Sequence, residues 1–153
     1  MRTSESITNI AAALLAAQTD MPHPKKASTN PHLRSKFADL NSVMDTTKPH
    51  LHEHGLVIFQ TVGGEVTEEG KCYATCTTKL VHAESGEFFE DRQQIPYEPQ
   101  KGLNTPQVYG VDYTYMKRYG WASVCGINAD TDDDGNESKG DVKAADPTSD
   151  FDL

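Results

Sequence analysis

Apolar residues near the start of the chain recur at the spacing of one helix face. They predict a helix that is capped by Ser4 or Thr3 and ends near Thr19, before Pro22 and Pro24. The face expected to point inward consists of Ile7, Ile10, Ala11, Leu14 and Leu15. The residues that follow, 21–31, are rich in proline and polar side chains, and they predict an extended connector.

The apolar pattern next predicts a second helix, from Ser35 or Asp39 to His54, with Gly55 as its end. Its inward residues are expected to be Leu40, Val43, Met44 and Leu51. Because proline lacks an amide proton and crowds the preceding turn, we expect Pro49 to kink or split this helix.

Alternation of side chains replaces the helical pattern after Gly55. Residues 56–62 predict a strand, Gly63 and Gly64 a turn, and residues 71–82 a longer strand, one face of which carries Cys72, Ala74, Cys76, Thr78 and Leu80. Residues 87–95 return as a third strand, which predicts an antiparallel meander. A last helix is predicted over residues 107–125, with Pro106 in its first turn.

This order of elements predicts an α+β fold. A small antiparallel β-meander and the helix after it form a β-β-β-α core, and helices cover one face of the sheet. A chain of 153 residues has room for one domain and a tail. We place the domain at residues 1–127 and an acidic, flexible tail at residues 128–153, where small polar residues predict disorder.

The net charge of −9 is concentrated in that tail. Residues 1–127 carry 12 Lys and Arg against 14 Asp and Glu, a balance of −2, whereas residues 128–153 carry 2 against 9, a balance of −7. The near-neutral body is therefore compatible with a basic surface if its charges are sorted by face.

The apolar segments and the cysteines indicate the cellular compartment. The stretch from Ile10 to Ala17 is too short for a membrane span and lacks a basic leader and a cleavage pattern. The odd number of cysteines, Cys72, Cys76 and Cys125, is not a disulfide framework and fits a reducing compartment. We expect a soluble protein of the cytoplasm with no membrane partner.

Residues 113–121 hold the densest chemistry, with the sequence Tyr-Thr-Tyr-Met-Lys-Arg-Tyr-Gly-Trp. Cations neutralise phosphates, and flat rings offer stacking surfaces to unpaired bases. Because side chains four apart share a helix face, Tyr115 goes with Tyr119, and Tyr113 with Lys117. We assign Tyr115 and Tyr119 to packing and Tyr113 to a DNA groove. The alternative, that the tyrosines are all core or subunit contacts, stays open.

The chain resembles a known family in an ordered set of short blocks. These are residues 35–40 (SKFADL), 48–51 (KPHL) with Gly55, Leu56 and Gln60, 78–82 (TKLVH) with 85–87 (SGE), 114–119 (TYMKRY) and 132–136 (DDDGN). Together they are similar to the essential recombination function (ERF) family of phage single-strand annealing proteins.

The resemblance implies ATP-independent binding of single-stranded DNA and annealing of complementary strands in phage homologous recombination, within the bacterial host cytoplasm. It implies a ring or filament of identical chains, a fold of the ring-forming annealing type, and no catalytic residues. A host or phage single-stranded DNA-binding protein or an exonuclease is an implied partner. We expect no cofactor beyond a modulatory divalent cation.

On this reading, cationic side chains hold the DNA backbone in a basic groove. The first-rank contacts are Arg34, Lys36, Lys117 and Arg118, and those behind them are Lys79, Arg92 and Lys101, with Tyr113 in the groove. An acid at Asp112, next to this motif, is an unexpected charge for a DNA face. The signature of a nucleotide phosphate loop is missing from the sequence, which argues against ATP-driven strand exchange.

Two other functions stay open. One is a metal-dependent DNA nuclease built on His82, Glu90 and Asp91, and the other is a plain single-stranded DNA-binding protein, which would slow pairing.

Three further motifs are weighed against simple solvated segments. Asp130, Asp132, Asp134, Gly135 and Asp141 approach the spacing of a calcium loop, but Asp replaces the usual terminal Glu. A zinc site is suggested by His50, His52 and His54 with Cys72 and Cys76. Helical spacing disfavours it, because residues two apart on a helix point in nearly opposite directions. The C-terminal residues 150–153 (DFDL) are similar to the acidic tips by which single-stranded DNA-binding proteins recruit partners, and we expect them to dock to a partner or compete for the groove.

Overall fold

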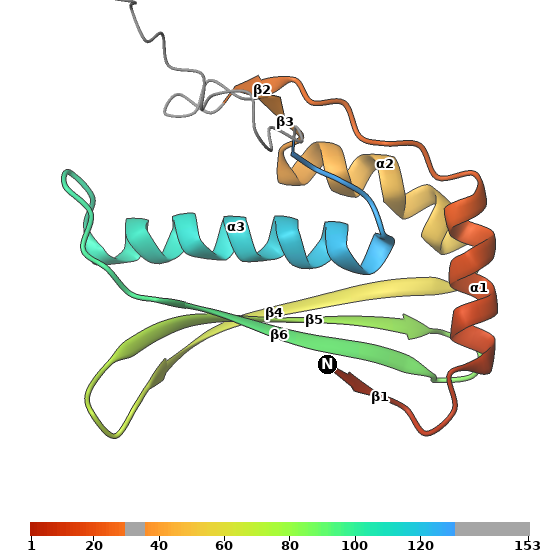
Figure 1. Cartoon of the computed structure of the whole chain (residues 1–153), viewed down its shortest axis with the longest axis horizontal. Coiled ribbons are helices and arrows are strands. Elements are labelled where there is room, and N and C mark those ends of the chain that lie inside the picture. The colour runs from red at the N-terminus through yellow and green to blue at the C-terminus, as the bar shows by residue number, and fades with distance from the viewer. Residues whose placement is uncertain (30–35, 131–153) are drawn as a thin grey trace, which may run out of the picture.

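The computed structural model describes residues 1–29 and 36–130. Its elements are β1 (Arg2–Thr3), α1 (Thr8–Thr19), β2 (Ser28–Thr29), β3 (Lys36–Phe37), α2 (Leu40–Glu53), β4 (Leu56–Val66), β5 (Cys72–His82), β6 (Phe88–Pro96) and α3 (Thr105–Cys125). Figure 1 shows α2 and α3 above one face of a sheet, with α1 standing at the end of the sheet. The predicted α+β fold is confirmed.

The main sheet has the strand order β1-β6-β5-β4, with antiparallel neighbours throughout. The predicted meander is present, but the predicted turn at Gly63 and Gly64 is wrong. Both glycines lie in β4, opposite Thr75 and Ala74, and the chain turns later, where Thr67 and Lys71 share a hydrogen bond and Gly70 has a φ of 77°. Glycine is tolerated in an extended strand, and only the later turn demands the positive φ.

The inner face of β5 lies under α3, as the alternation predicted. Ala74, Cys76, Thr78 and Leu80 are all buried. The two layers approach closely at Gly120, where a Cβ atom would lie 2.4 Å from the Thr78 Oγ1 atom. The core therefore depends on a glycine in the middle of a helix, a place where glycine normally costs stability.

The start of α1 is held by a side chain far away in sequence. Glu87, in the turn before β6, accepts hydrogen bonds from the backbone amide of Ile10 at 2.8 Å and from the side chains of Ser6 and Asn9. The amide of Ile10 contributes most to holding the pKa of this carboxyl below its ordinary value. The predicted cap at Ser4 or Thr3 is wrong, because Ser4 bonds to Phe88 and the helix begins at Thr8.

The inward face of α1 is rotated from the predicted one. Ile10 and Ala17 are buried, whereas Ile7 and Leu15, expected inward, are 41% and 68% exposed, and Ala11 is exposed too. Both faces of this helix are apolar, so periodicity alone did not decide which one meets the core.

Helix α2 begins and ends as predicted. Asp39 accepts a hydrogen bond from the Ser42 amide at the N-cap, and Gly55 follows the last turn with a φ of 67°. Pro49 lies inside the helix without splitting it. One lost backbone bond is tolerated here because Thr47 and Leu51, on the opposite face, are buried in the core.

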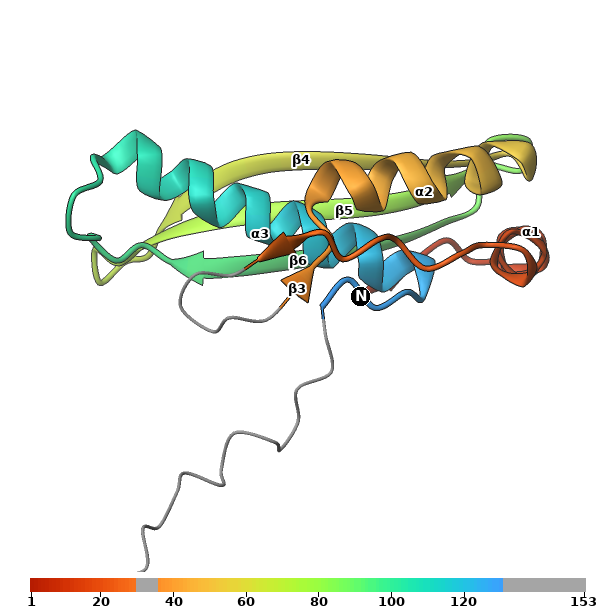
Figure 2. The same cartoon turned by 90° about the horizontal axis from the view of Figure 1, so that it is seen from above.

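Two short strands within the connector region were not predicted. Ser28 and Thr29 of β2 pair with Phe37 and Lys36 of β3, and the chain after α3 packs against the same place. Ala129 is buried and its carbonyl accepts a hydrogen bond from Ala38, so the packed body extends past the predicted limit at residue 127. Figure 2, seen from above, shows β2 and β3 over the middle of the molecule.

Across the described residues, no helix is long and apolar enough to cross a membrane. The three cysteines are free thiols.

Candidate nucleic-acid interface

A buried arginine surrounded by aromatic rings stands out on the helix layer. The Arg118 guanidinium lies 4.6 Å from the centre of the Phe37 ring, 4.7 Å from that of Tyr119 and 5.4 Å from that of Tyr115. We call Phe37, Tyr115, Arg118 and Tyr119 the aromatic–arginine cluster. It joins β3 to the middle of α3, two segments that are about 80 positions apart in the sequence.

The positive charge of the cluster is met by a carboxylate. Arg118 donates to Asp130 Oδ1 at 2.7 Å, to the Tyr119 hydroxyl at 3.2 Å and to the Ala38 carbonyl at 3.5 Å. Desolvation raises the pKa of the Tyr119 hydroxyl, and the nearby Arg118 charge opposes that rise.

One lysine reaches the same point, and a second is the neighbour of Phe37 in sequence. Lys26 Nζ donates to the backbone carbonyl of Asp130, and Lys36 is exposed in β3 next to Phe37, which forms a bridge with Asp130. Cations from the connector and from α3 therefore meet at one acidic residue, whereas Lys36 is the strand neighbour of Phe37 and points to the other face of β3. Such a gathering of charge, with rings beside it, is what a phosphate and an unpaired base require.

Two tyrosines on α3 are more exposed than their expected packing role implies. Tyr115 and Tyr119, assigned to packing, are 41% and 42% exposed. Tyr113, assigned to the groove, is half-buried between helix and sheet, where its hydroxyl donates to the Gly63 carbonyl at 3.2 Å and its ring stacks on Tyr109. The spacing rule grouped the rings correctly but could not say which group faces the sheet.

Arg118 also differs from its expected setting as an open phosphate contact. Its residue exposure is 5%, and its guanidinium is already paired with Asp130. Lys117 is half-buried on the other side of α3, and its backbone carbonyl accepts a hydrogen bond from Gln60.

The second-rank cations lie elsewhere. Lys79 and Arg92 project from the uncovered face of the sheet, where Lys79 pairs with Glu90 and Arg92 with Glu65. Lys101 is exposed in the loop before α3, and Arg34 lies outside the described residues. The structure thus places Lys36 in the strand whose Phe37 contacts Arg118, and sets Lys79 and Arg92 apart on the uncovered face of the sheet.

Asp112, the unexpected acid, does not face the interface. It is 8% exposed within α3, and burial raises the pKa of its carboxyl. Its charge therefore falls in the core layer and leaves the outer face of α3 open to an anion.

The candidate metal sites are not assembled in the described part of the chain. Residues 1–29 and 36–130 contain no group of three or more His, Cys, Asp or Glu side chains able to hold a metal ion. Glu90 and Asp91 are successive strand residues, so they point to opposite faces of the sheet, and the His82 ring bonds to Ser85. Beyond Asp130, the calcium-like loop and the C-terminal residues 150–153 lie outside the described residues.

Sequence reasoning did not assign Lys26, Phe37 or Asp130 to this interface, and it considered Asp130 only as part of a calcium-like loop. Phe37 stood inside a block that resembles the family, but its contact with Arg118 needs the unpredicted pairing of β2 and β3. A pocket of about 130 Å³ opens beside the cluster and is lined by Phe37, Asp39, Leu40, Thr114, Tyr115 and Arg118. It offers apolar and aromatic walls, one guanidinium edge and the carboxylate of Asp39 to a ligand.

Comparison with known proteins identifies the family. No curated protein and no solved structure matches the chain as a relative. The model of the ERF superfamily matches residues 10–150, nearly the whole length, and the chain therefore belongs to the ERF superfamily.

Proposed function

We propose that this chain binds single-stranded DNA and anneals complementary strands, without ATP, in phage homologous recombination within the bacterial host cytoplasm. Membership of the ERF superfamily supports the process, because the family implies single-strand annealing. The aromatic–arginine cluster, with Lys26 and Lys36 beside it, is the observation that supports the DNA contact. Residues 1–130 form the working body of the protein on this proposal.

Annealing requires no covalent chemistry from the protein. Base pairing supplies the free energy, and the obstacle is the repulsion between two polyanions that must meet in register. Cations that neutralise phosphates lower that repulsion, and exposed rings stack on unpaired bases, each stack contributing about 1–3 kcal/mol. Lys36, exposed next to Phe37, is suited to neutralise a phosphate. Tyr119, an exposed ring of the cluster, is suited to stack on a base.

Asp130 occupies the position at which a DNA phosphate would meet Arg118. A carboxylate and a phosphate both accept hydrogen bonds from a guanidinium in the same geometry. We therefore expect incoming DNA to exchange with Asp130, so that the Arg118 charge passes from one anion to the other without being left unpaired.

Self-assembly into a ring or filament belongs to the same proposal, as does recruitment by a single-stranded DNA-binding protein or an exonuclease. Lys79, Arg92, Lys101 and Tyr113 stay predicted contacts, and so does Lys117, which the sequence placed in the first rank; the side chains of all five lie away from the cluster. Arg34 keeps its first rank by sequence alone.

The binding part of the proposal is tested by fluorescence anisotropy with a labelled oligothymidine at several salt concentrations. We expect Lys36→Gln with Tyr119→Leu to weaken binding and to reduce the slope of log affinity against log salt by about 0.7 for the lost phosphate contact. Lys71→Gln is the control: it removes one exposed cation next to β5, where Lys71 pairs with Glu69, and this residue is not a predicted DNA contact. An equal loss from Lys71→Gln would show that the loss is not specific to the cluster and would refute the proposed site.

A further inference from the structure

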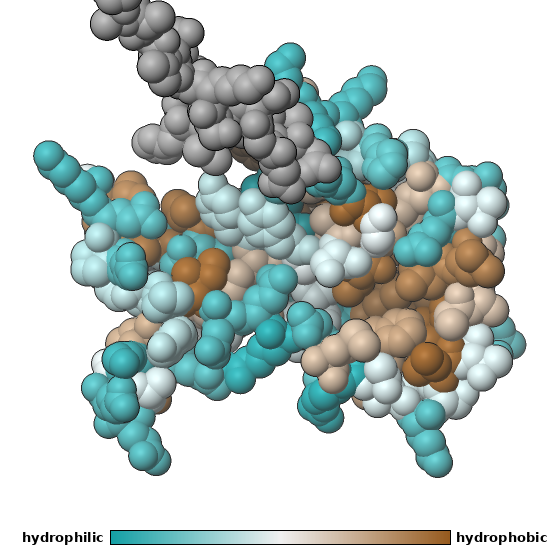
Figure 3. Space-filling view, viewed as in Figure 1, coloured by the Kyte–Doolittle hydropathy of each residue, from teal (hydrophilic) through white to brown (hydrophobic). Residues whose placement is uncertain are grey.

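Two apolar surfaces at opposite ends of the molecule have no partner among the described residues. One is the outward side of α1, where Ile7, Ala11 and Leu15 are exposed at i, i+4 and i+8; we call it the α1 ridge. Figure 3 shows apolar surface over this end of the molecule and a separate apolar patch over the first half of α3. A single exposed leucine needs no explanation, but paired apolar surfaces mark interaction sites.

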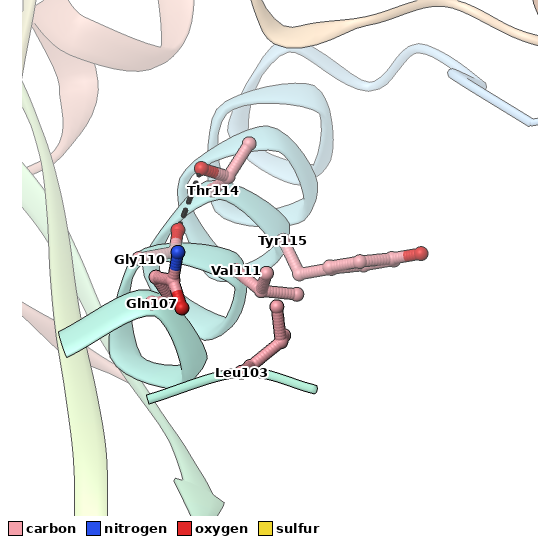
Figure 4. A pocket seen from close by; sticks show the side chains of 6 residues that line it. All are labelled: Leu103, Gln107, Gly110, Val111, Thr114 and Tyr115. Carbon is pink, nitrogen blue, oxygen red and sulfur yellow. Dashed lines mark hydrogen bonds between the residues drawn. The ribbon is translucent and has the colours of Figure 1, made fainter. Parts of the chain in front are cut away.

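The second surface is a groove along α3. It has a volume of about 510 Å³ and is lined by Leu103, Gln107, Gly110, Val111, Thr114 and Tyr115; we call it the α3 groove. Figure 4 shows Leu103, Val111 and Tyr115 side by side on one flank, with Gly110 and Thr114 joined by a hydrogen bond. Because a Cβ on Gly110 would meet nothing within 4 Å, this small residue leaves open space beside the larger ones.

The ridge and the groove are both built from helical rows of side chains. At about 1.5 Å per residue, the eight-residue step from Ile7 to Leu15 spans about 12 Å, as does the step from Gln107 to Tyr115. Rows of side chains at i±4 on one helix pack into the grooves between such rows on another. Neither surface carries a charge of its own.

The charges around the two surfaces are also complementary. The α1 ridge is flanked by the exposed acids Glu5 and Asp20. The α3 groove is flanked by the exposed cation Lys101, just before Leu103, whereas Arg118, just beyond Tyr115, is buried and paired with Asp130 and adds no charge to the rim. Opposite charges at the rim favour one partner and one orientation.

We propose that the α1 ridge of one chain docks into the α3 groove of a second copy. The ridge lies at one end of the molecule and the groove at the other, as Figures 1 and 2 agree, so the contact is head to tail. A contact of this kind leaves a free ridge and a free groove on every dimer, and repetition gives a ring or an open filament. This contact gives a surface to the self-assembly in the proposed function, but it does not depend on DNA.

The test measures oligomeric state by sedimentation velocity and light scattering, without DNA, at tens of micromolar protein. Leu15→Glu disables the ridge and Val111→Glu disables the groove. Both change exposed helical positions to a good helix former, and circular dichroism checks that the fold is kept. Val66→Glu, at a 71% exposed apolar residue in β4, is the matched control.

We expect the wild type and Val66→Glu to assemble, and each of the other two variants to associate at least about 30-fold more weakly, as for loss of a central interface anchor. An equimolar mixture of Leu15→Glu and Val111→Glu chains should form a one-to-one complex, because one intact ridge and one intact groove remain between them.

Three results would overturn the inference. These are a monomeric wild type, unchanged assembly of both variants, and a mixture that stays monomeric. A loss of DNA affinity in monomeric Val111→Glu but not in Leu15→Glu would instead assign the groove to nucleic acid. Failure of DNA binding in chains that still assemble would refute the proposed function and leave this contact standing.

Discussion

Replacement of Gly120 by alanine should destabilise the fold, although alanine is the better helix former. The added Cβ would lie 2.4 Å from Thr78 Oγ1 and 3.5 Å from Gln60 Nε2. The Thr78 hydroxyl is held in place by a 3.0 Å hydrogen bond from Gln60, so it cannot turn away without breaking that bond. Helix and strand must therefore move apart.

The expected size follows from two opposing terms. Overpacking of a well-filled core costs about 1–3 kcal/mol, and a contact this short belongs at about 3 kcal/mol. Alanine in a helix returns about 1 kcal/mol relative to glycine. The free energy of unfolding should thus fall by about 2 kcal/mol, which lowers the Tm by about 4–8 °C in a chain of this size.

The assay is thermal unfolding by circular dichroism, with Gly110→Ala as the control in the same helix. At Gly110 an added Cβ meets nothing within 4 Å, so that variant should gain about 1 kcal/mol and unfold about 2–4 °C higher. Combining Gly120→Ala with Thr78→Ala should recover at least about 1 kcal/mol of the loss as a coupling energy. A Gly120→Ala variant that unfolds at or above the wild-type temperature would refute this account of the helix–sheet contact.

Three further predictions concern buried ionisable groups. The hydrogen bond from the Ile10 amide lowers the pKa of Glu87, so its stabilising effect is present above the ordinary glutamate value and is lost as the pH falls; Glu87→Gln should lower the Tm at pH 7 and make little difference near about pH 3. Burial raises the pKa of Asp112, so its effect on stability has the opposite sign: stability is lost as the pH rises above the ordinary aspartate value. The Tm of Asp112→Asn should therefore exceed that of the wild type by a margin that grows toward neutral pH. A margin that stays constant with pH would contradict this prediction. Burial raises the pKa of Cys125 to about 12, so iodoacetamide at pH 8 should alkylate the half-buried Cys72 well before Cys125, as followed by mass spectrometry of the native protein.

The elements that were predicted well are those whose signals are local. The alternation from Cys72 to Leu80 gave both the strand and its buried face, and Asp39 with Gly55 gave the limits of α2. Pro106 marked the first turn of α3, whose capping box joins Asn104 and Gln107. Each of these signals rests on neighbours within a few positions of the chain.

The errors came from contacts between distant residues. Glu87 replaces Ser4 at the start of α1 because a turn of the sheet lies beside that helix. The exposed side of α1 could not be foreseen either, since its two faces are nearly equally apolar. On our proposal that side is a contact between chains, and this would explain an apolar surface that the fold of one chain does not use.

The candidate site was half visible in the sequence. Residues 113–121 announced the rings and cations, but the enclosure of Arg118 by Phe37 and its pairing with Asp130 depend on β3 and on the segment after α3. The helix spacing placed Tyr115 with Tyr119, yet only the packing of Met116 and Tyr113 against the sheet shows that this pair faces outward.

The rate at which two complementary labelled oligonucleotides pair, at fixed salt and without ATP, tests the central claim most directly. The comparison is between the wild type and Lys36→Gln with Tyr119→Leu, two exposed positions outside the α3 groove. We predict that the wild type accelerates pairing and that the variant, while still folded and assembled, does not. A wild type that binds the strands but slows their pairing would contradict annealing and identify a plain single-stranded DNA-binding protein.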